Sequence, residues 1–525
     1  MCARPSRPNG GSSLSDTDRP RRNGPARDWL GPLAAGGVPL AVYLATAARH
    51  VLDGDSAVLA TQAYRLGLAQ PPGYPLMALL GKAVTTCLPL GTLAWRAHAV
   101  AALAAAGSLA LGYALLRRWG VARAVAVLAA WLLGFSPLFW SQALHANPYI
   151  VAVAAALGVM LLLDLWAQRG GLRLLGAAAF VYGLGMGGHP SLALYLPAVG
   201  LFAVLHLRRQ GWRRALVGGL VGVAAAAAGC AIWLTYDLYY LVTTAPASGG
   251  ESLGTRLAAL LTASGSPSDW RQFFTGVAAA DYPAQLALHA TRAIAELSPV
   301  GALLAFAGAI ALGRRRWDVL LLVGLGYLAQ MNFAATLRHW HHYDVYRLPC
   351  HAVEALLMGV GLDLAWARVS VARWRAVALA AAAALVLGPP YAALALSPAG
   401  PLRHVTPRSP WRGEFARLGH LDGLGALGCA EQGATVVANY GPYGTLRFLR
   451  EVEGAGVGVR LEAGFGPGGE RLRALLAGGA PVYAYLRRDE TAAREGLTRR
   501  FEMRETLPGA LHTLERVLSR RVGKE

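Results

Sequence analysis

Long apolar segments recur along most of this chain and are separated by short polar connections. Runs rich in Ala, Leu, Val and Gly begin near residue 29 and end near residue 396. Each has about 18 residues or more, enough to cross roughly 30 Å of hydrocarbon as a helix. The pattern predicts eleven membrane helices, at about 29–48, 95–116, 121–138, 149–167, 173–188, 190–207, 214–242, 298–313, 317–336, 349–367 and 375–396.

The composition agrees with a polytopic α-helical membrane protein. The chain has 525 residues, of which 55% are hydrophobic and 15% charged, with a mean hydropathy of +0.39. Its net charge of +20 does not indicate nucleic-acid binding, because the arginines separate the apolar segments instead of gathering in one stretch. The five cysteines are scattered without a CxxC spacing, so they indicate neither a disulfide framework nor a zinc site.

Charge alternates between successive connections and predicts the topology. Every second connection is basic; these clusters are Arg117, Arg118 and Arg123; Arg169 and Arg173; Arg208, Arg209, Arg213 and Arg214; Arg314, Arg315 and Arg316; and Arg368, Arg373 and Arg375. The connections around 136–148 and 188–190 contain no Lys or Arg. By the positive-inside rule, the amino terminus is cytoplasmic, and an odd number of spans places the carboxyl terminus outside the cell membrane. We expect an inner (plasma) membrane location.

The two ends of the chain differ from the middle. Residues 1–28 are polar, basic and rich in Pro, Gly and Ser, which predicts a disordered cytoplasmic tail and not a signal peptide. Residues 397–525 contain strand-like segments at 434–440, 457–464 and 481–487, with helical spacing between them, and a further helical segment at 489–501. The pattern predicts a small extracytoplasmic α/β domain that lacks a phosphate loop.

Within the membrane domain, 29–396, the polar chemistry is concentrated in the outer connections. Few ionisable residues lie near the middle of a span, which is where transporters and proton pumps usually carry them. Four outer patches stand out. They are the loop 49–94, with Asp53, Asp55, Arg65, Gln70 and "PPGYP"; "FWSQALHANPY" (139–149); "GMGGHPS" (185–191); and "TLRHWHHYDVYRLPCH" (336–351).

The two carboxylates of the first patch, Asp53 and Asp55, lie two residues apart and would share a face in an extended segment. A carboxylate at a membrane boundary can have a raised pKa, which suits a general base that takes a proton from a hydroxyl. Alternatively, Asp55 and Ser56 cap the helix that follows. The two roles do not exclude each other. "PPGYP" cannot continue a helix and predicts a rigid bend.

The fourth patch combines positive charge with aromatic residues. Its arginines and histidines could hold a lipid-linked phosphate. His341, His342 and Asp344 could instead bind a divalent metal, although their spacing matches no standard motif. An interfacial aromatic belt is the alternative without a ligand. His145 and His189, each alone at a span end, are weaker candidates.

One stretch carries a family resemblance. "GDSAVLATQAYRLGLAQPPGYPLMALLGK" resembles the signature of a protein O-mannosyltransferase-like family among the GT-C membrane glycosyltransferases, formerly catalogued as a domain of unknown function. The matched positions are Gly54, Asp55, Ser56, Leu59, Leu66, Gly67 and 71–76. Val58 and Gln70 stand where the family commonly has Glu and His. In "FWSQALHANPY", Asn147 stands at a second Glu position.

The resemblance implies a GT-C-like inverting transferase that uses a polyprenyl-phosphate-linked sugar, with mannose as one candidate. Its partners would be membrane lipids, the lipid-linked donor and a protein or glycan acceptor; no cofactor is certain. Asp55 would be the base, with Asp53 as a second catalytic candidate. The substrate-binding candidates are Arg65, Gln70, Tyr74, Asn147, His189, Arg338, His341, His342, Asp344 and Arg347. A flippase or transporter and an inactive scaffold remain alternatives.

Overall fold

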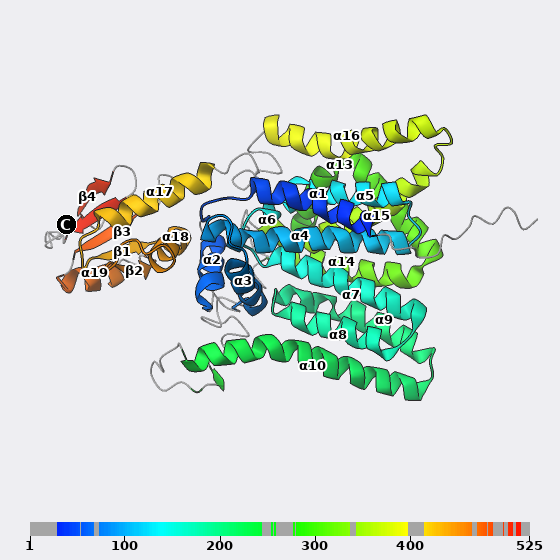
Figure 1. Ribbon diagram of the computed structural model, residues 1–525, viewed down its shortest axis with the longest axis horizontal. Coiled ribbons are helices and arrows are strands. Elements are labelled where there is room, and N and C mark those ends of the chain that lie inside the picture. Colours follow the sequence, from blue (N-terminus) through cyan, green and yellow to red (C-terminus); the bar gives the residue numbers. More distant parts are fainter. Residues whose placement is uncertain are drawn as a thin grey trace, which may run out of the picture.

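The structure is a computed structural model with two parts, a helical bundle followed by a smaller α/β part (Figure 1). It describes residues 29–52, 54–67, 73–243, 280–336, 343–396, 414–464, 470–479, 481–486, 502–507 and 511–515, with a few isolated positions between them.

The helices of the bundle run roughly side by side in Figure 1, as expected for membrane spans. They are α1 (Leu30–Thr46), α4 (Leu93–Arg118), α5 (Arg123–Gly134), α6 (Pro137–Ala143), α7 (Tyr149–Arg169), α8 (Leu172–Met186), η1 (Pro190–Tyr195), α9 (Leu196–Arg208), α10 (Trp212–Thr243), α13 (Tyr282–Arg315), α14 (Trp317–Thr336), η2 (Tyr343–Arg347), α15 (Leu348–Trp366) and α16 (Ala372–Leu396).

Each of the eleven predicted spans falls on one or more of these helices. Within the described residues, eight helices are long and apolar enough to cross a membrane, or nine if α5 and α6 count as one span bent by 73°. The bend precedes Pro137, which cannot continue a helix from the preceding turn. The remaining two, α1 and α8, have 17 and 15 residues. The chain is therefore polytopic, and the count of eleven stays a prediction.

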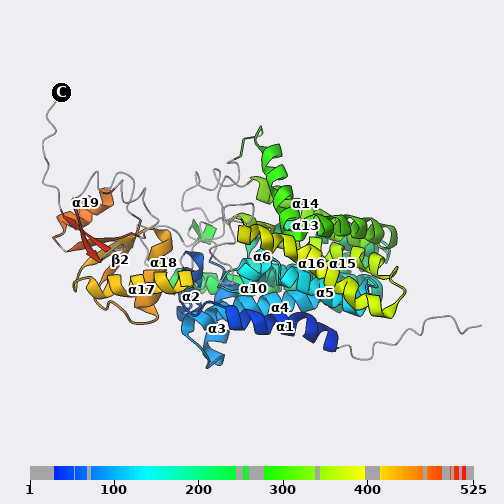
Figure 2. The same ribbon diagram turned by 90° about the horizontal axis from the view of Figure 1, so that it is seen from above.

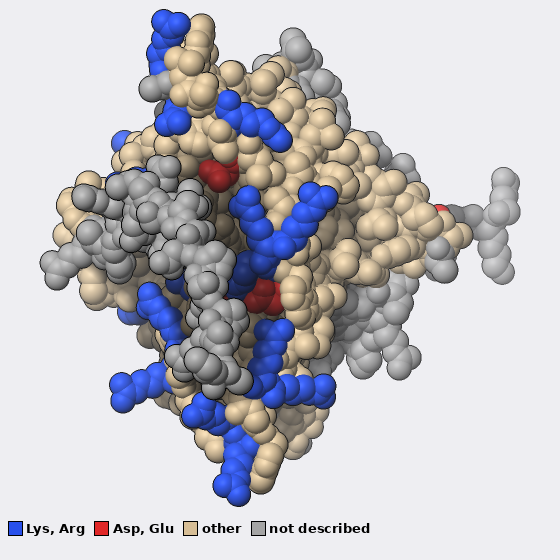
Figure 3. Space-filling model, turned by 90° about the vertical axis from the view of Figure 1, so that its right-hand side faces the viewer, with Lys and Arg blue, Asp and Glu red and all other residues tan. Residues whose placement is uncertain are grey.

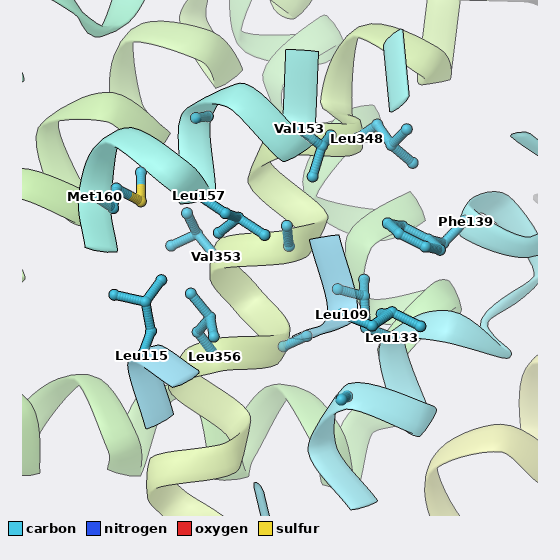
Figure 4. Close-up of a cluster of buried hydrophobic side chains, with 14 of the residues drawn as sticks. Leu109, Leu115, Leu133, Phe139, Val153, Leu157, Met160, Leu348, Val353 and Leu356 are labelled. Carbon is cyan, nitrogen blue, oxygen red and sulfur yellow. The ribbon is translucent and has the colours of Figure 1, made fainter. Parts of the chain in front are cut away.

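The apolar core lies where α4, α7 and α15 meet. Figure 4 shows their side chains interdigitating, among them Leu109, Leu157 and Val353. Glycines bring α13 and α15 into backbone contact, since a Cβ atom on Gly308 would lie 1.8 Å from the Leu357 carbonyl oxygen. Small residues at helix crossings are the usual basis of packing within a membrane.

The basic connections all lie at one end of the bundle. Figure 3 shows that end, with Lys and Arg surrounding a few acidic side chains. Asp164 is 1% exposed and accepts from Arg118 Nε at 2.6 Å and from Arg316 Nη2 at 2.9 Å. Arg316 also pairs with Asp318 at 3.0 Å. The charge alternation therefore corresponds to a real division between the two ends of the bundle.

At the other end, two short helices lie across the bundle beside the α/β part (Figures 1 and 2): α2 (Asp55–Arg65) and α3 (Pro75–Cys87). The bend predicted from "PPGYP" separates them. Gly73 and Tyr74 both have left-handed backbones, with φ of 93° and 48°. The Leu76 N–H donates to the Gly187 carbonyl at 3.0 Å, which ties the bend to the loop after α8.

The α/β part contains α17 (Glu414–Cys429), β1 (Thr435–Ala438), α18 (Tyr440–Glu451), β2 (Arg460–Ala463), α19 (Glu470–Ala477), β3 (Val482–Tyr485), β4 (Glu502–Leu507) and β5 (Leu511–Glu515). The sheet order is β2-β1-β3-β5-β4, with β1 parallel to β2 and β3, and β5 antiparallel to β3 and β4. β1, β2 and β3 fall on the predicted strand segments. The β4–β5 hairpin was not predicted, because its strands are rich in charged residues. The helix predicted at 489–501 lies outside the described residues except for Leu497.

Candidate functional site

Asp55 is the first residue of α2, and Gly54 occupies the cap position. Gly54 has φ 73° and ψ −139°, a conformation that favours glycine, and no side chain forms a cap hydrogen bond. The cap position therefore belongs to Gly54, and not to Asp55 or Ser56 as one interpretation of the sequence had it. The half-buried carboxylate of Asp55 lies at the amino-terminal end of α2.

The fold brings all four outer patches to one place. The ring of His189 lies between three tyrosines, with centroid distances of 5.7 Å to Tyr74, 4.9 Å to Tyr149 and 5.6 Å to Tyr346. Tyr149 and Tyr346 are 5.2 Å apart. Asp55 lies within electrostatic reach of Tyr149. An acidic side chain thus adjoins a buried group of one histidine and three tyrosine rings.

His189 is fixed in one tautomer. Its Nδ1 accepts from the Ser191 backbone N–H at 3.0 Å and lies 2.8 Å from Ser191 Oγ, so the neutral ring carries its proton on Nε2. Burial lowers the pKa of His189 to about 3. His189 is therefore a neutral hydrogen-bond donor at physiological pH, and its Nδ1 organises the start of η1.

The side chain of Asn147 hydrogen-bonds to backbone groups of the turn between α6 and α7. Its Nδ2 donates to the Gln142 and His145 carbonyls, the latter at 2.9 Å, and its Oδ1 accepts from the Ile150 N–H at 3.2 Å. The side chain is 2% exposed. These contacts with backbone groups make Asn147 an organiser of the loop that presents Tyr149.

Arg65 is directed to the α/β part. Its Nε and Nη2 donate to the Glu451 carbonyl, at the end of α18, at 3.1 and 2.7 Å. The helices α2 and α18 also touch near the start of α2, where Gly444 of α18 lies against its first turn. Sequence patterns gave no signal for Gly444, since its partners lie almost 400 residues away.

Arg347 lies inside the bundle and not at its outer surface. Its side chain is fully buried, and Nη1 donates to the His289 carbonyl at 3.2 Å. Nearby, His351 Nε2 lies 2.8 Å from Ser136 Oγ and its Nδ1 lies 3.2 Å from Glu354. Sequence reasoning placed Arg347 beside a lipid phosphate, whereas the structure places it in the packing of α13 and α15.

The structure does not describe the side chains of the other predicted site residues. Asp53, Gln70, Arg338, His341 and His342 are not among the described residues, and for Asp344 only the backbone is described, within η2. Among the residues that are described, no group of three or more His, Cys, Asp or Glu side chains could hold a metal ion. The possible metal ligands of the fourth patch are outside that search, so metal binding there stays a prediction.

Comparison with known proteins confirms the resemblance. Residues 55–213 match the family model of the protein O-mannosyl-transferase TMEM260 N-terminal domain. The chain is 31% identical to protein O-mannosyl-transferase TMEM260 of Mus musculus over 182 residues, 34% of this chain and 25% of that protein. It is 30% identical to the Dictyostelium discoideum protein over 125 residues, 22% of this chain and 15% of that protein. The chain thus spans a quarter or less of these curated relatives.

Solved structures identify the fold. ArnT from Cupriavidus metallidurans bound to undecaprenyl phosphate superposes with a TM-score of 0.56 at 15% identity, covering 94% of this chain and 99% of ArnT. Its apo state gives 0.54 at 16% identity, covering 93% and 97%. The likeness extends over the bundle and the α/β part. This chain therefore shares the fold of ArnT over almost its whole length.

Proposed function

We propose that this protein is an inverting membrane glycosyltransferase that moves a sugar from a polyprenyl-phosphate-linked donor to an acceptor hydroxyl on the extracytoplasmic side. The family match over residues 55–213 and the fold support glycosyl transfer. Mannose is the first sugar to test, because the matching relatives are named O-mannosyl-transferases. The undecaprenyl phosphate bound to ArnT supports a lipid-linked donor.

The observation that carries the proposal is the position of Asp55. It begins α2 at the junction of the bundle and the α/β part, near Tyr149 in the cluster formed with Tyr74, His189 and Tyr346. A lipid-linked donor and a water-soluble acceptor can meet at such a junction. The site lies at the end of the bundle opposite the arginine-rich end, which the positive-inside rule assigns to the cytoplasm.

In the proposed reaction, Asp55 accepts the proton of the acceptor hydroxyl. The hydroxyl oxygen attacks the anomeric carbon, the bond from that carbon to the phosphate oxygen breaks, and the lipid phosphate leaves with the electron pair. The His189 Nε2–H is available as a donor to the sugar, and the tyrosine rings offer faces against which it can pack. Arg338, His341 and His342 remain our candidates for stabilising the departing phosphate.

The test compares Asp55→Asn with wild-type protein in a mannose-release assay from polyprenyl-phospho-mannose. Loss of the base should lower the rate by about 100-fold or more while leaving the melting temperature unchanged. Asp281→Asn is the matched control, because Asp281 is an exposed carboxylate that also precedes a helix. Full activity of Asp55→Asn contradicts the assignment. Movement of the lipid across vesicles without sugar consumption favours a flippase.

A further inference from the structure

A small cleft lies between α2 and α18, beside the proposed base. It is a shallow hollow that opens to solvent: its empty space of about 180 Å³ includes solvent-filled space outside the cleft, so a bound group would remain partly in water. Its walls are Val58, Thr61, Gln62, Arg65, Gly67 and Arg447. The proposed glycosyl transfer leaves this cleft without a role.

The cleft lies along the side of α2 that also carries Asp55. Val58, Gln62 and Arg65 follow Asp55 by three, seven and ten residues, which places all four on neighbouring turns of one helical face. At a rise of 1.5 Å per residue, Gln62 and Arg65 lie about 10 to 15 Å along the helix from Asp55. A molecule that presents its hydroxyl to Asp55 can therefore reach the cleft with a neighbouring group.

Two guanidinium groups line the cleft. Arg65 uses Nε and Nη2 on the Glu451 carbonyl, and Arg447 uses Nε on Glu451 Oε1 at 2.9 Å. Each arginine has five N–H donors, so both keep donors beyond these contacts. Arg450 adds a further positive charge beside Glu451, at 3.6 Å. Two arginines thus face the Glu451 carboxylate and Arg65 faces its backbone carbonyl, so three positive charges surround this one negative charge.

Gln62 supplies a hydrogen-bond acceptor to the cleft, whereas the arginines supply donors. It is 2% exposed, and its Nε2 donates to the Gly73 carbonyl. Among the residues that the structure describes, no group donates a hydrogen bond to its buried Oε1, which is costly unless a ligand supplies a donor. The cleft thus offers charged donors from Arg65 and Arg447 together with one buried acceptor.

We propose that this cleft binds an acidic peptide segment of a protein acceptor. An Asp or Glu side chain supplies the carboxylate for Arg65 and Arg447, and a backbone N–H supplies the donor for Gln62 Oε1. A lipid phosphate offers no such donor, so it fits the cleft less well. An extended peptide advances about 3.3 to 3.6 Å per residue, which places the acidic residue three or four positions from the glycosylated Ser or Thr. The proposal rests on the proposed function for its acceptor.

The first test is equilibrium binding, measured by fluorescence anisotropy on the full chain in detergent. The probes are two labelled peptides that contain one Ser and differ only in a Glu or a Gln four residues away. We expect about fivefold tighter binding of the Glu peptide, weakening at high salt, because the arginines are partly exposed to water. Arg447→Gln should remove the preference. Arg473→Gln, an exposed arginine on α19, should keep it.

The second test measures mannose transfer to the same peptides. Arg447→Gln should raise KM for the Glu peptide about fivefold, with kcat, KM for the Gln peptide and KM for the lipid donor unchanged. Equal binding of both peptides by wild-type protein overturns the proposal, and so does a rise in KM for the donor alone. If the Glu peptide binds selectively but no sugar moves, the glycosyltransferase proposal fails and the cleft stands. If sugar moves to both peptides with equal KM, the cleft proposal fails and the glycosyltransferase proposal stands.

Discussion

The contact between α18 and α2 predicts that Gly444→Ala reduces activity more than stability. A Cβ atom on Gly444 would lie 3.1 Å from the Gly54 carbonyl oxygen, 3.2 Å from Ala57 Cβ and 3.3 Å from Val58 Cγ2. All three distances are shorter than ordinary van der Waals contacts. Either α18 or the first turn of α2 must move by a few tenths of an ångström, and that turn carries Asp55.

The substitution has two opposing effects on stability. Overpacking of this kind costs about 1–3 kcal/mol. Replacing glycine by alanine inside a helix such as α18 returns about 1 kcal/mol. The net loss of stability should be about 1 kcal/mol. Misplacement of a catalytic group by about 1 Å can lower the rate about 100-fold, so a smaller shift at Asp55 should lower kcat about tenfold.

The assay is mannose release together with thermal unfolding in detergent. Gly428→Ala is the control, because Gly428 lies within α17 and has open space where a Cβ atom would stand. It should leave kcat unchanged and keep or slightly raise the melting temperature. Full kcat in Gly444→Ala would refute the view that α18 positions the first turn of α2.

Two further predictions concern stability. Asp164→Asn leaves the charge of Arg118 unbalanced and removes one of the two carboxylates that pair with Arg316, so it should lower the free energy of unfolding by about 3 kcal/mol, measured by thermal melting; a shift no larger than that of Asp281→Asn would contradict it. Burial and repulsion from His50 lower the pKa of His420 to about 4, below its ordinary 6.5, so protonation favours the unfolded state. Stability should fall as the pH drops from 7.5 to 5.5, and His420→Gln should flatten that dependence; an unchanged slope in the variant would refute it.

The local pattern of apolar and charged residues was sufficient to predict many of the helices and strands. Apolar length placed the predicted spans on segments that are helical, and the placement of arginines distinguished the two ends of the bundle, because both signals are read within one segment and its flanks. The strands β1, β2 and β3 were found for the same reason. The charged β4–β5 hairpin was not predicted, since its stability comes from pairing with β3 and not from an apolar pattern of its own.

The sequence by itself determined which residue types lie in the outer connections, including Asp55, the "PPGYP" bend and His189. Only the tertiary structure decided what each of them contacts. In the structure, Gly54 caps α2 and Asn147 hydrogen-bonds to its own loop. Arg347 is buried, and Arg65 donates to the last residue of α18. The physical reason is that hydrophobic periodicity fixes the direction and burial of a segment, whereas a side chain's partners depend on how segments distant in the chain pack together.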